Sequence, residues 1–262
     1  MSSAINMMSH NHKYIIKCFP KSGCSTIRNL YINLHWNEMK QYDEKPIETD
    51  FHNNYPRETD SVFWDERFKD YKKIIIIRNT YERVVSMFFN RFLDIPDFNC
   101  LLYDQTDIYR RRGPRYDVSF DDFLVMLENG DIGGSDEHFS PQNIEAGEPF
   151  SHDIIYLNEL NEKLPLWYEK ELGWDSDKIQ EVMDLLNDKK EIAMISGHRK
   201  CVGPNVEKMN TYNFKRDPEN LRVMINGIPK KNQMITEDNA KIIYKIYKGE
   251  IEEHNFKYEH LL

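Results

Sequence analysis

Short apolar runs alternate with longer segments of helical periodicity along the chain. A short, mostly apolar run at residues 14–19 predicts a β-strand, and residues 152–157 are a further strand candidate. Residues 74–77 are four consecutive isoleucines, which is typical of a strand buried on both faces. Helical spacing follows in residues 27–34, 81–92, 120–127, 160–172, 175–186 and 236–253. Strands that alternate with helices predict an α/β fold: a P-loop-like central parallel β-sheet flanked by helices on both faces.

The length of 262 residues is typical of one domain, and we expect it to cover residues 13–262. Residues 1–12 are polar and are predicted to be a disordered leader. Residues 36–70 and 196–235 have no clear periodicity and are interpreted as long irregular connections.

Composition narrows the class of protein. The net charge of −9 argues against nucleic-acid binding, and an anionic ligand would need a local cluster of positive charge. The chain has neither a run of about 18 apolar residues, as a membrane span needs, nor the apolar core of a signal peptide. The four cysteines show neither a zinc pattern nor a disulfide framework. We therefore expect a soluble, cytoplasmic protein with reduced thiols.

The first apolar run is followed by a glycine-containing turn and then by a predicted helix. This strand–turn–helix order is that of a phosphate-binding loop, in which backbone N–H groups and the helix N-terminus face an anion. Gly23 permits close approach, Lys21 supplies positive charge, and Ser22, Ser25 and Thr26 supply hydroxyl donors. The segment is not a Walker A motif, because the lysine precedes the glycine. Taken alone, the Lys-Ser-Gly tripeptide is better explained as a solvated turn with an incidental lysine.

A second group of residues supports the phosphate interpretation. Arg78 ends the buried isoleucine strand, at the edge where ligands bind in open α/β sheets. Ser86 lies eight residues later in the next predicted helix. Together the two residues suit a second phosphate group; the alternative is a strand-end arginine and an ordinary helix serine.

With these two motifs the chain resembles the sulfotransferases that use 3′-phosphoadenosine 5′-phosphosulfate. The segment Pro20-Lys21-Ser22-Gly23-Cys24-Ser25-Thr26 resembles their 5′-phosphosulfate loop, and residues 77–86 resemble their 3′-phosphate motif. Asn79 and Thr80 depart from the Asp-Pro that is usual there. Tyr109-Arg110-Arg111-Arg112-Gly113 resembles a loop of the heparan 2-O group, and residues 136–142 resemble the His-x-x-Pro-Gln element of the chondroitin 4-O group. The likeness is thus to the carbohydrate branch, whose Golgi members carry a membrane anchor.

The resemblance implies transfer of a sulfuryl group to an acceptor hydroxyl, with no metal. Lys21 is the candidate for stabilising charge on the leaving phosphate. A histidine should take the acceptor proton. His52 lies 26 residues before Arg78, a separation like that in the family, and His138 is the rival because of its context. The alternative for either residue is a surface or structural histidine.

A basic cluster is the candidate substrate surface. This cluster places four arginines in a stretch of six residues, although the chain as a whole is acidic: Arg110, Arg111, Arg112 and Arg115. The cluster would attract an anionic glycan; the alternative is a solvated loop with no specific role. By analogy with the family, residues 197–208 would close over the adenosine. Two other functions remain open: a P-loop-type nucleotide kinase, which would want a Walker A motif and Mg²⁺ carboxylates, and a non-catalytic nucleotide-binding module.

Overall fold

The computed structural model describes residues 4–35, 63–88, 120–132, 137–142, 150–187 and 234–259. The chain divides into two units. Unit 1 comprises Met1–Arg78 and Gln142–His198, and unit 2 comprises Asn79–Pro141 and Arg199–Leu262. The chain therefore leaves unit 1 after Arg78 and returns to it at Gln142. The expectation of one domain over residues 13–262 stays a prediction.

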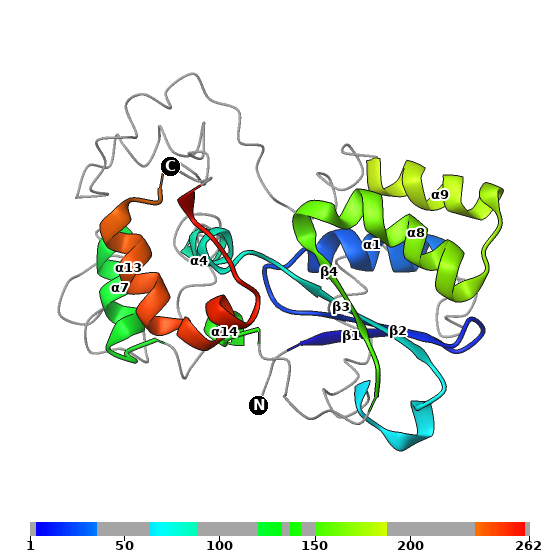
Figure 1. The fold of residues 1–262 in the computed structure, drawn as a ribbon, viewed down its shortest axis with the longest axis horizontal. Helices are drawn as coiled ribbons and strands as arrows, with labels where there is room; N and C mark the ends of the chain where they lie inside the picture. The colour runs from blue at the N-terminus through cyan, green and yellow to red at the C-terminus, as the bar shows by residue number, and fades with distance from the viewer. Residues whose placement is uncertain are drawn as a thin grey trace. The chain divides into compact units, whose positions relative to one another are not determined.

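Unit 1 is built on a sheet with the strand order β1-β2-β3-β4 (Figure 1). The strands are β1 (Ile5–Ser9), β2 (Tyr14–Cys18), β3 (Lys72–Ile77) and β4 (Asp153–Tyr156). β2 pairs in parallel with β3, and β3 with β4, while β1 runs antiparallel to β2. The predicted fold class, a mainly parallel central sheet with helices around it, is confirmed.

The prediction of a disordered leader is wrong for Ile5–Ser9, which form strand β1. Ile5 pairs with Cys18, and Ser9 pairs with Tyr14. The apolar part of this segment is short and interrupted by Asn6, so it carries little signal of its own. Its stability comes from the hairpin with β2 and from Met7, which is fully buried.

Three helices cover one face of the sheet (Figure 1). They are α1 (Cys24–His35), α8 (Leu160–Leu172) and α9 (Ser176–Asn187), which lie where the apolar periodicity predicts helices. Their apolar side chains pack on alternate strand residues, including Tyr14, Ile16 and Ile74. On the opposite face, the Lys17 ammonium lies 5.4 Å from the centre of the Trp64 ring and 5.5 Å from that of Phe63. The aromatic rings compensate this buried cation in part.

Two 3₁₀ turns flank these strands. They are η2 (Glu66–Phe68), which precedes β3, and η6 (Leu157–Glu159), which follows β4 and leads into α8. Leu157 of η6 lies close to Gly23 in the loop after β2.

The described part of unit 2 is helical. It contains α4 (Thr80–Phe88), α7 (Phe120–Glu128), η5 (Glu137–Phe139), α13 (Glu237–Ile246) and α14 (Lys248–Glu253). The Phe123 ring lies at the centre of its aromatic packing, 5.5 Å from Phe88 and 5.6 Å from Phe139 between ring centres.

The last helix begins as the sequence predicts but is interrupted. The Thr236 side chain accepts from the N–H of Asn239 in a capping box. We expect one helix through about residue 253, but the structure has two, because Tyr247 leaves the helical conformation at φ −112° and ψ 29°. The buried Tyr247 hydroxyl donates to the carbonyl of Phe139 at 2.8 Å. This tertiary contact accompanies a break that apolar periodicity alone does not reveal.

Candidate active site

The loop between β2 and α1 begins with a tight turn. The N–H of Ser22 donates to the carbonyl of Phe19 at 3.0 Å, which places Pro20 and Lys21 at the two central positions. Lys21 has a φ of 67°, so proline followed by a left-handed residue gives the pattern of a type II turn. A non-glycine residue held in that region costs about 1–3 kcal/mol and persists only where its surroundings fix it.

Gly23 is required at its position for two reasons. Its φ is 88°, and a Cβ added there would lie 2.5 Å from the Cδ1 atom of Leu157. Helix α1 begins at the next residue, and its first intrahelical bond joins the N–H of Ile27 to the carbonyl of Gly23 at 3.0 Å. The first turn of α1 holds no acidic residue. The N-terminal N–H groups of the helix therefore suit an anion.

Two buried thiols flank the loop, because Cys18 ends β2 and Cys24 begins α1. Burial raises the pKa of Cys18. A hydrogen bond from Cys18 lowers the pKa of Cys24 from its ordinary value of 9.0 to about 7, and the positive charges of Arg28 and Lys21 act in the same direction. The surroundings of the loop thus favour negative charge at the start of α1.

Arg78 follows the last residue of β3 directly and is 8% exposed. Because β2 and β3 are parallel neighbours, their carboxyl ends lie at the same edge of the sheet. The Nη1 atom of Arg78 donates to the carbonyl of Lys21 at 3.1 Å. The structure therefore brings together Lys21 and Arg78, one residue from each of the two predicted phosphate motifs.

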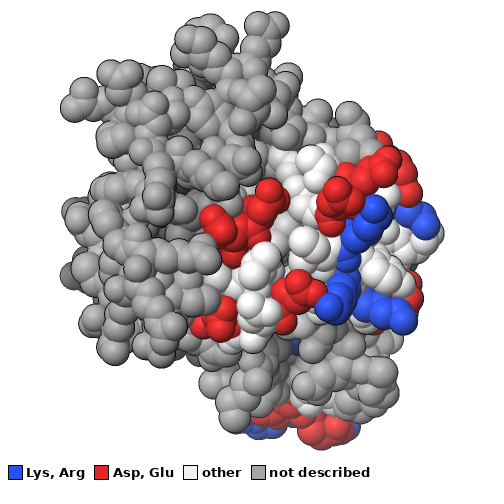
Figure 2. All heavy atoms as spheres, turned by 90° about the vertical axis from the view of Figure 1, so that its left-hand side faces the viewer, with Lys and Arg blue, Asp and Glu red and all other residues white. Residues whose placement is uncertain are grey.

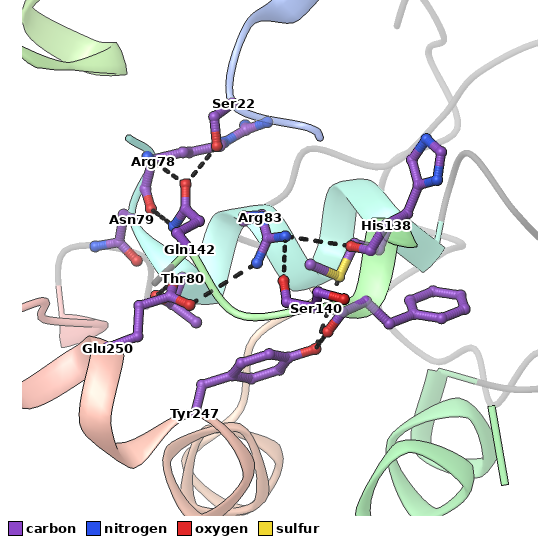
Figure 3. A network of polar contacts seen from close by, with 12 residues as sticks. Ser22, Arg78, Asn79, Thr80, Arg83, His138, Ser140, Gln142, Tyr247 and Glu250 are labelled. Carbon is purple, nitrogen blue, oxygen red and sulfur yellow. Dashed lines mark hydrogen bonds and ion pairs between the residues drawn. The ribbon is translucent and has the colours of Figure 1, made fainter. Parts of the chain in front are cut away.

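Gln142 connects the same two segments (Figure 3). Its Oε1 atom accepts from the backbone N–H of Arg78 at 2.9 Å and from the hydroxyl of Ser22. Its Nε2 atom donates to the carbonyl of Arg78 at 2.8 Å. From the sequence, the Ser22 hydroxyl is expected to donate to an anion, whereas in the structure this hydroxyl donates to Gln142. Sequence reasoning noted Gln142 only as part of a family-like element and gave it no role.

In unit 2, a buried arginine holds the segment that precedes Gln142 in the chain (Figure 3). The Nη2 atom of Arg83 donates to the carbonyls of Ser140 at 2.6 Å and His138 at 3.3 Å. Its Nη1 atom lies 3.9 Å from a carboxylate oxygen of Glu250, and both side chains are fully buried. Glu250 also accepts from the hydroxyl of Thr80. Sequence reasoning gave no role to Arg83 or Glu250. Helical spacing places Arg83 away from the predicted apolar stripe of α4, so periodicity gave no signal of its burial.

The remaining predicted site residues fall into two groups. Ser86 is half-buried on α4, and His138 is half-buried in η5. His52, the arginines at positions 110, 111, 112 and 115, and residues 197–208 lie outside the described residues. Their predicted roles stay predictions.

The described surface carries mixed charge. Figure 2 shows acidic and basic side chains interspersed on the described part of one face. In unit 2, Lys245 pairs with Glu128 and Lys241 pairs with Asp238. Within the described ranges, no helix combines the length and the apolar character that a membrane crossing requires.

The fold is that of an α/β protein. Its loop after β2 lies at the carboxyl edge of the parallel strands, next to an arginine at the end of the neighbouring strand, and ligands of open α/β sheets bind at that edge. Residues 6–258 match the Sulfotransferase family, which is most of the 262 residues, and the chain belongs to that family. It is therefore a transferase of sulfuryl groups. No curated protein and no solved structure matches the chain.

Proposed function

We propose that the protein transfers a sulfuryl group from 3′-phosphoadenosine 5′-phosphosulfate to an acceptor hydroxyl. One observation carries this proposal: the strained loop after β2 and the arginine after β3 are in direct contact, through the bond from Arg78 Nη1 to the Lys21 carbonyl. A nucleotide with anionic groups at both its 5′ and 3′ positions needs two such sites held close together. Membership of the Sulfotransferase family supports the same donor.

The loop is assigned to the 5′-phosphosulfate. Lys21 contributes positive charge, the N–H groups at the start of α1 contribute donors, and Gly23 keeps the backbone accessible. Cys24, Ser25 and Thr26 form the first turn of that helix. Both the N–H and the hydroxyl of Ser22 donate within the protein, so in this proposal Ser22 shapes the loop.

Arg78 and Ser86 are assigned to the 3′-phosphate. A guanidinium forms strong, charge-assisted hydrogen bonds with phosphate oxygens, and a serine hydroxyl adds a further donor. The bond from Arg78 Nη1 to the Lys21 carbonyl holds the guanidinium next to the loop, and a guanidinium carries five N–H donors in all.

The reaction needs a base and a group that stabilises the leaving phosphate. The acceptor oxygen attacks sulfur while a neutral histidine takes its proton, and the bond between sulfur and the bridging oxygen breaks. Lys21 stabilises the negative charge that develops on that oxygen. His52 and His138 are the two candidate bases; the carbonyl of His138 is held by Arg83. Replacing the true base with alanine should lower kcat by about 10²–10⁴-fold.

The proposed acceptor is a carbohydrate hydroxyl. This choice rests on the resemblance of residues 109–113 and 136–142 to carbohydrate sulfotransferases. The arginines at 110, 111, 112 and 115 would attract a sulfated or carboxylated glycan. An acceptor panel should therefore include anionic and neutral glycans of equal length.

The nucleotide class is tested by thermal unfolding with adenosine 3′,5′-bisphosphate, ATP or GTP. A ligand that binds the native state raises the midpoint of unfolding, and we expect the largest rise with the bisphosphate. A larger rise with ATP and Mg²⁺ would favour a kinase. Transfer of labelled sulfate to an acceptor then distinguishes an enzyme from a nucleotide-binding module.

A further inference from the structure

We propose that Gln142 is a positioning residue that fixes the phosphosulfate loop and the strand end at Arg78 in one arrangement. The three hydrogen bonds from the Gln142 side chain to Ser22 and Arg78 are called the Gln142 bridge below. This inference rests on the proposed function, because its consequence is that the 5′ and 3′ groups of one nucleotide are bound as a unit.

The geometry of the bridge suits a primary amide. Gln142 engages both backbone groups of Arg78, at 2.9 Å for the N–H and 2.8 Å for the carbonyl. A neighbouring β-strand would bond to the same two backbone groups. The Gln142 amide therefore extends the hydrogen bonding of β3 by one residue beyond its end. The Oε1 atom accepts a second bond from the Ser22 hydroxyl. A glutamate carboxylate lacks the donor, and a methionine of similar shape lacks the donor and offers only a weak sulfur acceptor.

Burial indicates why these three bonds matter. Gln142 and Ser22 are both 0% exposed. Burying a side-chain amide away from water costs free energy unless its polar atoms form hydrogen bonds. An apolar side chain would fill the same volume without needing such partners. What the amide supplies instead is direction, because each of its bonds fixes one named backbone or side-chain atom.

The bridge has a consequence for ligand binding. Arg78 is tied to the loop twice, once through Gln142 and once through its own bond to the Lys21 carbonyl. Lys21 is held at a φ of 67°, a conformation that needs support from its surroundings. A bridge that orients both segments before the ligand arrives lowers the cost of binding a ligand that spans them. A ligand that uses the loop alone gains less from it.

The test compares adenosine 3′,5′-bisphosphate with AMP, which lacks the 3′-phosphate, by titration calorimetry. We expect Gln142→Met to weaken bisphosphate binding by about tenfold or more and to change AMP binding much less. Ser22→Ala removes a single bond of the bridge and should show the same pattern to a smaller degree. In the Gln142→Met background, Ser22→Ala should cause no further loss, because the bond is already gone.

A matched control is available in the same unit. Gln180 is exposed on α9, where its amide bonds only to Asp184 among the contacts described for it. Gln180→Met makes the same chemical change away from the loop and should leave both affinities unchanged. If Gln142→Met does not fold, Ser22→Ala carries the test.

Each outcome is decisive. Folded bridge variants that lose equal affinity for both nucleotides would overturn the positioning role, and equal loss in Ser22→Ala would point to a direct 5′-phosphate contact by Ser22. Unchanged affinities would also overturn it, while the proposed function stands. A wild-type protein that binds AMP as tightly as the bisphosphate would overturn the proposed function, and with it the role of the bridge.

Discussion

Gly23→Ala tests the construction of the loop directly. The added methyl group has two separable effects. An alanine at φ 88° is disfavoured by about 1–2 kcal/mol relative to a right-handed conformation. The methyl carbon would also lie 2.5 Å from Leu157 Cδ1, and overpacking of this kind costs about 1–3 kcal/mol. Leu157 is half-buried and can move in part, so the expected total lies in the lower half of about 2–5 kcal/mol.

The two effects are separated by matched variants. Gly173, at the end of α8, has a φ of 66° and no atom within 4 Å of an added Cβ, so Gly173→Ala should show the conformational cost alone. Combining Gly23→Ala with Leu157→Ala should remove the steric part and leave the conformational part. Urea unfolding measures the free energy of each variant, and calorimetry with adenosine 3′,5′-bisphosphate measures binding. The reasoning is refuted if Gly23→Ala is as stable as Gly173→Ala and binds like the wild type.

Three further predictions concern neighbouring residues. Arg78→Ala and Ser86→Ala should weaken binding of adenosine 3′,5′-bisphosphate and leave AMP binding almost unchanged. The loss of the charged contact in Arg78→Ala should be about 1.5–3 kcal/mol. Equal losses for the two nucleotides in calorimetry would contradict the assignment of these residues to the 3′-phosphate. Cys24 should titrate near pH 7 in an absorbance difference between wild type and Cys24→Ser, and Cys18→Ala should raise that pKa by removing a donor. Because the folded pKa lies below the ordinary 9.0, the stability from this group is complete above about pH 9 and is lost as the pH falls through 7; an unshifted titration would contradict this. Arg83→Met leaves Glu250 buried without its cation and should lower the free energy of unfolding by about 3–5 kcal/mol, and a loss below 1 kcal/mol in urea would show that the pair matters little.

The parts of the fold that local pattern determines were predictable. The four isoleucines of β3 and the apolar spacing in α1 reflect burial of specific faces, and burial leaves a direct trace in the sequence. The loop after β2 was recognisable because a proline, a lysine and a glycine have separate conformational or electrostatic meanings there.

What the sequence did not reveal depends on contacts between distant residues. β1 forms through pairing with β2, and its own apolar content is too small to indicate a strand. The break at Tyr247 accompanies a hydroxyl bond to Phe139, which lies 108 residues away. Gln142 is 64 residues from Arg78 and 120 from Ser22, and a single buried glutamine gives no periodic signal.

Transfer of labelled sulfate from 3′-phosphoadenosine 5′-phosphosulfate is the most direct measurement of the central claim. With a panel of anionic and neutral glycans as acceptors, the wild type should form a labelled product and release adenosine 3′,5′-bisphosphate in equal amount. Lys21→Ala should lower kcat far more than it weakens binding of that nucleotide product, because the lysine stabilises charge that develops only during transfer. Transfer by Lys21→Ala at the wild-type kcat, or a wild type that binds the nucleotide but labels no acceptor with a hydroxyl group, would contradict the account.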